Sequence, residues 1–141
     1  MSERAKQVRY EKVKAASIQK KERGDCTVKA TAMAARMPYN EAHALLEALG
    51  RKKRSGFPFG LVAIQLRAIG FRVTETKPEQ KNGSKFTAKT IGAHCKSGYY
   101  VAKSRGHVFP VINGQVYDWT FGRKHRVIRL WKFEKIQKKG E

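Results

Sequence analysis

Three side chains that could act together on an acyl group stand at Cys26, His107 and Asp118. A cysteine sulfur becomes a nucleophile when it loses its proton, an imidazole can take and return that proton, and a carboxylate can hold the imidazole in one orientation. Cys26 directly follows Asp25, a residue type preferred at helix starts, and precedes a stretch rich in Ala and Met. The sequence therefore predicts a thiol in the first turn of a helix, where the positive end of the helix dipole favours the thiolate.

The imidazole and the carboxylate are predicted to lie on neighbouring strands of one hairpin. Asn113-Gly114 between two apolar runs is a strong signal for a two-residue turn, because both turn positions need a positive φ. The register of such a hairpin pairs Phe109 with Asp118. Since side chains alternate between the two faces of a strand, His107 and Asp118 then share a face as diagonal neighbours. A carboxylate at that position can reach the ring and fix its tautomer.

The elements that must position these residues follow from periodicity, caps and turn residues. Residues 1–23 lack a sustained apolar stripe and are interpreted as a basic arm. Helices are expected over 26–37, 40–50 and 58–70 with a short fourth one within 86–98, and strands over 71–76, 99–104, 107–112, 115–119 and 126–133. Helices followed by strands predict an α+β domain in which an amino-terminal helical layer packs on a carboxy-terminal antiparallel sheet. We expect an arm over 1–16, one domain over 17–133 and a basic tail over 134–141.

Two strings of the sequence resemble a known family: GDCTVKATAMAARMPYNEAHALLEALGR over 24–51 and GYYVAKSRGHVFPVINGQVYDW over 98–119. They are similar to small phage-encoded proteins related to the papain-like cysteine peptidases, in a layout close to the peptidase domains that trim double-glycine leaders from bacteriocins. The resemblance implies a papain-like fold and thiol-dependent cleavage of a peptide or amide bond, without a cofactor. It assigns Cys26 as nucleophile, His107 as base and Asp118 as the residue that orients His107.

The chain also departs from the family pattern. The peptidases carry a Gln six residues before the Cys as an oxyanion donor, whereas this chain has Lys20 there and the nearest Gln is Gln19. We take Gln19 as the candidate oxyanion residue. The peptidases usually follow the Cys with Gly, and this chain has Thr27.

A strong positive charge defines the alternative function. The chain has 31 Lys and Arg against 11 Asp and Glu, a net charge of +20, which attracts polyanions such as nucleic acids. The RKKR run, Arg51, Lys52, Lys53 and Arg54, is the candidate phosphate-binding site. The alternative is thus a basic protein that binds nucleic acid or ribonucleoprotein on a catalytically silent peptidase-like scaffold. A third possibility is a virion or host-takeover component whose partner is another protein.

Other features restrict the class of protein. No apolar run is long enough to cross a bilayer, and the amino terminus has no apolar signal-peptide core. Cys26 and Cys95 are the only cysteines and lack zinc-ligand spacing, so we expect neither a disulfide framework nor a metal site. The expected location is a reducing cytoplasm, that of the host for a phage protein, or the virion. Trp119 and Phe121 are expected in the core.

Overall fold

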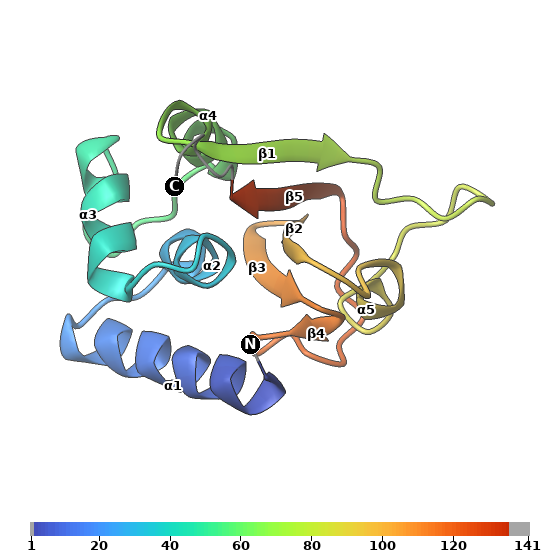
Figure 1. The fold of residues 1–141 in the computed structure, drawn as a ribbon, viewed down its shortest axis with the longest axis horizontal. Coiled ribbons are helices and arrows are strands. Elements are labelled where there is room, and N and C mark those ends of the chain that lie inside the picture. Colours follow the sequence, from blue (N-terminus) through green and yellow to red (C-terminus); the bar gives the residue numbers. More distant parts are fainter. Residues whose placement is uncertain (1, 136–141) are drawn as a thin grey trace, which may run out of the picture.

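The computed structural model describes residues 2–135, which form a mixed α+β fold (Figure 1). Four helices come first, followed by most of the strands. The helices are α1 (Glu3–Gln19), α2 (Cys26–Ala34), α3 (Tyr39–Ala48), α4 (Phe59–Ala68) and α5 (Ile91–His94); the strands are β1 (Phe71–Thr76), β2 (Tyr99–Ser104), β3 (His107–Ile112), β4 (Gln115–Val116) and β5 (Arg129–Lys135). The strands make one antiparallel sheet in the order β1-β5-β2-β3-β4. The predicted α+β class, with helices amino-terminal and strands carboxy-terminal, is confirmed.

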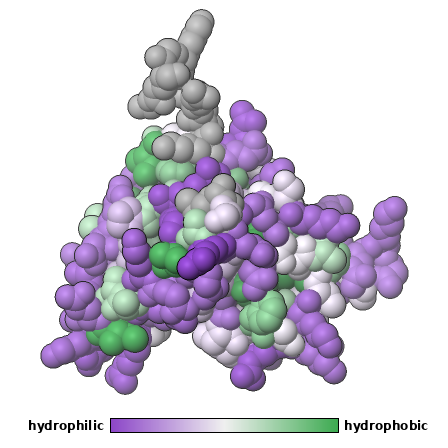
Figure 2. Space-filling model, turned by 60° about the horizontal axis from the view of Figure 1, so that its bottom comes forward, coloured by the Kyte–Doolittle hydropathy of each residue, from purple (hydrophilic) through white to green (hydrophobic). Residues whose placement is uncertain are grey.

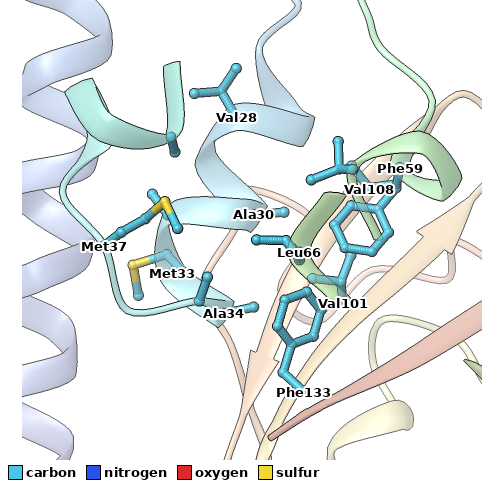
Figure 3. Packing of buried hydrophobic residues seen from close by; sticks show 14 of the residues in the cluster. Val28, Ala30, Met33, Ala34, Met37, Phe59, Leu66, Val101, Val108 and Phe133 are labelled. Atoms are coloured by element: carbon cyan, nitrogen blue, oxygen red, sulfur yellow. The ribbon is translucent and has the colours of Figure 1, made fainter. Parts of the chain in front are cut away.

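One face of the sheet packs against α2, which lies between the sheet and the outer helices α1 and α3 (Figure 1). The side chains of α2 that point toward the strands are small, notably Ala30 and Ala34, and they meet Val101, Val108 and Phe133 (Figure 3). All these side chains are almost completely buried. Small residues allow the helix axis to approach the sheet closely, and this brings the start of α2 next to the start of β3.

The opposite face of the sheet is covered by the segment that contains α5. Ile91 and Cys95 are fully buried there against Phe109 and Leu130. The helix can lie this close because Gly92 has no side chain: a Cβ at that position would collide with the carbonyl oxygen of the hairpin turn. The segment was expected to be one short helix within 86–98, and only one turn of it is helical.

The hairpin of β3 and β4 has the predicted turn and register. Asn113 and Gly114 both have positive φ, and Ile112 pairs with Gln115. The strand β4 ends at Val116 and is shorter than the predicted 115–119, and a turn begins at Asp118. The expected strand pairing of Phe109 with Asp118 was therefore wrong, although the register from which it was derived is confirmed.

The interpretation of the amino-terminal segment as a free arm was also wrong. Residues 3–19 form a helix that starts at Ser2, whose hydroxyl accepts a hydrogen bond from the Ala5 N–H at 3.1 Å. Val13 and Ser17 of this helix are buried against the rest of the domain. The expected basic tail over 134–141 lies outside the described residues except for positions 134 and 135, which complete β5. Within residues 2–135, no helix has the length and apolar character needed to span a bilayer.

Candidate active site

His107, the first residue of β3, is held by Asp118 just beyond β4. Its Nε2 lies 2.7 Å from Asp118 Oδ2. The same carboxylate oxygen accepts hydrogen bonds from the hydroxyl of Thr120 at 2.7 Å and from its backbone N–H at 3.1 Å. Thr120 is fully buried, so its two hydrogen bonds hold the carboxylate in place. Asp118 thus has the position of an orienting residue for the imidazole.

The thiol of Cys26 lies on the other side of the same imidazole. Burial raises the pKa of Cys26, but a hydrogen bond with His107, one from the backbone N–H of Val108 and the charge of the imidazole outweigh burial and lower this pKa below its ordinary value. Burial also lowers the pKa of His107, yet the hydrogen bonds with Asp118 and Cys26 raise it to about 9. Both shifts favour a thiolate and an imidazolium at neutral pH. Since Nε2 is bound to Asp118, Nδ1 is the ring nitrogen left for Cys26.

The position of Asp25 led us to expect that its side chain caps α2, but it does not. Its side chain makes no capping hydrogen bond and turns inward, where Oδ2 accepts from the hydroxyls of Ser17 and Tyr39, each at 2.6 Å. Burial raises the pKa of Asp25, but these two hydrogen bonds and the nearby Lys29 ammonium lower it overall. The carboxylate is therefore ionised, and the N–H groups of the first turn of α2 have no side-chain cap. Sequence patterns could not identify Ser17 and Tyr39 as hydrogen-bond donors to Asp25, because neither residue type is typical of binding a buried carboxylate.

Trp119 packs against the imidazole of His107. The centroids of the two rings lie 4.9 Å apart, and Trp119 also makes a T-shaped contact with His125 at a centroid distance of 5.3 Å. Trp119 is nevertheless 58% exposed and Phe121 60% exposed, so their expected burial in the core was wrong. The turn that begins at Asp118 places both side chains on the surface, with Trp119 in contact with His107. Cys26 itself is partly exposed.

No hydrogen bond or ion pair links the side chain of Gln19 to this group of residues in the described part of the chain. Gln19 is the last residue of α1, and its side chain is exposed. The candidate oxyanion residue thus has no observed partner in the site.

The RKKR run divides into buried and exposed residues. Arg51 is 5% exposed and donates to both carboxylate oxygens of Glu22, at 3.0 and 3.2 Å. This contact, with further hydrogen bonds from His43 and the backbone of Arg54, lowers the pKa of Glu22 to about 2. Arg51 is therefore a structural residue that ties the loop before Cys26 to the loop after α3, and its expected contact with phosphates was wrong.

Comparisons with protein-family models, with curated proteins and with solved structures found no match to this chain. The residues 2–135 contain no group of three or more His, Cys, Asp or Glu side chains that could hold a metal ion. The geometry of Cys26, His107 and Asp118 is thus the evidence from which a function can be argued.

Proposed function

We propose that the chain is a cysteine hydrolase of the papain-like type that cleaves a peptide or amide bond. One observation carries this proposal: a single imidazole, that of His107, lies between the carboxylate of Asp118 and the thiol of Cys26. This is the order of contacts that nucleophile, base and orienting residue require. The partial exposure of Cys26, and its place at the start of a helix, support the proposal further.

The reaction follows from the charges of this pair. The thiolate of Cys26 attacks the carbonyl carbon, the carbon–sulfur bond forms and the carbonyl π electrons move to oxygen. The imidazolium of His107 gives its proton to the leaving nitrogen as the carbon–nitrogen bond breaks, which leaves a thioester. Water then attacks the thioester while His107 takes its proton, and cleavage of the carbon–sulfur bond releases the acid and restores the thiolate.

The developing oxyanion needs hydrogen-bond donors close to the sulfur. The N–H groups of the first turn of α2 are suited to this, because Asp25 leaves them without a side-chain cap and the helix dipole is positive there. Gln19 can act as a second hydrogen-bond donor to the oxyanion only if its side chain moves when the substrate binds. Trp119 provides exposed apolar surface next to His107 on which substrate side chains can pack.

The proposal is tested by exposing the full chain to a diverse library of synthetic peptides and detecting new termini by mass spectrometry. We expect cleavage by the wild-type protein and by Cys95→Ala, and none by Cys26→Ala. A peptide carrying an electrophilic ketone should also modify Cys26 and leave Cys95 untouched. If no peptide is cleaved and this electrophile modifies Cys26 no faster in the wild type than in His107→Ala, the proposal is wrong.

A further inference from the structure

A groove with a volume of about 420 Å³ lies between α1 and the turn that joins α2 to α3. Its lining is partly apolar: Pro38 is exposed and Ala16 partly exposed, whereas Val13, Met37 and Tyr39 are almost completely buried. Three cationic side chains, Arg9, Lys12 and Arg36, also line it. Cys26 does not line it. Figure 2, in which the α1 side of the molecule comes forward, shows a mostly hydrophilic surface with scattered apolar side chains.

The three cations have no acidic partner within the part of the chain that the structure describes. Arg51 and Arg129, by contrast, each bind both oxygens of a glutamate. Burial lowers the pKa of Arg9 most, Tyr99 raises it, and repulsion from the charge of Arg36, which lines the same groove, also lowers it. An anion between them would relieve this repulsion.

Arg36 occupies a position that the backbone would rather give to glycine. It follows α2 with a φ of +57°, and the next N–H, that of Met37, bonds back to Ala32 O at 3.0 Å, which is the usual helix-ending turn. Its guanidinium lies over the ring of Tyr99 at 3.8 Å and is thereby oriented. Arg9 has a structural task as well, since its Nη2 donates to Ala32 O at 3.1 Å. The backbone at position 36 therefore does not require an arginine.

We propose that this groove binds one nucleotide unit of a single-stranded nucleic acid, with the phosphate between Arg9, Lys12 and Arg36 and the base on the apolar part of the lining. A single strand offers both the phosphate and an unstacked apolar base face. A duplex keeps its bases stacked, and an acidic peptide offers carboxylates without such a face. The net charge of +20 brings polyanions to the molecule, and the groove gives them a defined site.

The test compares two variants of the full chain that lose the same charge. In Arg36→Gly with Lys12→Ala, glycine suits the left-handed backbone and position 12 is an exposed helix position, so the fold is kept. In Lys52→Ser with Lys53→Ser, two exposed cations of the RKKR run are removed instead. Binding of a short fluorescein-labelled oligothymidylate is followed by anisotropy at several salt concentrations. We expect the groove variant to bind about 20-fold more weakly near 0.1 M salt, with a flatter salt dependence, and the loop variant to change by less than about 3-fold.

Several results would overturn the proposal. Equal losses in the two variants would mean that only net charge matters, and a larger loss in the loop variant would move the site to Lys52 and Lys53. A blocked DNA duplex that binds as tightly as the single strand, or an acidic peptide that displaces the oligonucleotide at equal charge concentration, would exclude a nucleotide site. Cys26→Ala should bind as the wild type does, so this test is independent of the proposed hydrolase activity.

Discussion

The two cysteines of this protein lie on opposite sides of the same sheet and have opposite surroundings. Cys26 is partly exposed at the start of α2, and its pKa is lowered by its contacts with His107 and the backbone of Val108 despite burial. Cys95 follows α5 in an apolar cluster, is fully buried, and burial raises its pKa to about 12. Cys95 is adjacent to His94 in sequence, yet His94 stacks on Phe86 instead. The comparison shows that the lowered pKa of Cys26 comes from the packing of α2 on β3 and not from a histidine adjacent in the sequence.

The largest effect that we expect is a difference in alkylation rate between the two thiols. At neutral pH, iodoacetamide should modify Cys26 at least about a thousandfold faster than Cys95, because a thiol with a pKa near 12 is almost fully protonated and this one is also buried. Peptide mass spectrometry at a series of times measures both rates in one sample. In denaturant the two rates should become similar. Comparable rates in the folded protein would remove the contrast on which the proposed chemistry rests.

The next effect concerns the imidazole that distinguishes the two sites. His107→Ala should slow the alkylation of Cys26 about 30-fold at pH 7, since a partly buried thiol without this partner has a raised pKa. In the wild type, the alkylation rate of Cys26 should rise in a pH range below the ordinary thiol pKa of about 8.5. In His107→Ala, the rate should rise in a pH range above that value. Peptide cleavage should fall as pH rises through about 9, where His107 loses the proton that it donates.

The matched control for this experiment is His94→Ala, which removes the exposed histidine next to the other cysteine. It should change neither alkylation rate, because His94 contacts Phe86 and Cys95 is shielded by burial. A His107→Ala protein whose Cys26 reacts as fast as in the wild type would show that the helix start alone activates the thiol.

The sequence could predict those features of the two cysteine sites that depend on residues close together in the chain. The Asn113-Gly114 turn fixed the hairpin register, and the Ala-rich stretch after Asp25 indicated the helix that carries Cys26. Contacts between distant segments were not predictable. The bond of Arg51 to Glu22 leaves no pattern in the sequence, and an Asp before a helix is normally read as its cap. The packing of α1 was missed because few apolar residues anchor it.

The smallest effect that we expect is a difference in stability between two variants that each lose one tyrosine hydroxyl, one near Cys26 and one near Cys95. Tyr39→Phe removes one of the two hydroxyls that bind the buried Asp25 carboxylate, and it should lower the free energy of unfolding by about 1.5 kcal/mol. The matched change near Cys95 is Tyr100→Phe. The Tyr100 hydroxyl has no hydrogen-bond partner among residues 2–135, so this variant should differ from the wild type by less than about 0.5 kcal/mol. Urea titration measures both.

The pH dependence of these two variants sharpens the comparison, because the pKa of Asp25 is lower in the folded protein than in the unfolded chain. The stability that its carboxylate contributes is therefore present above the unfolded pKa of about 3.9 and is lost as pH falls toward the folded value. Tyr39→Phe weakens this contribution, so the gap to the wild type should be widest near neutral pH and should shrink in acid. Tyr100→Phe should follow the wild type at every pH. If the difference in stability between Tyr39→Phe and the wild type stayed constant from neutral pH into acid, Tyr39 would act by packing alone. Its hydroxyl would then not stabilise the charged carboxylate of Asp25.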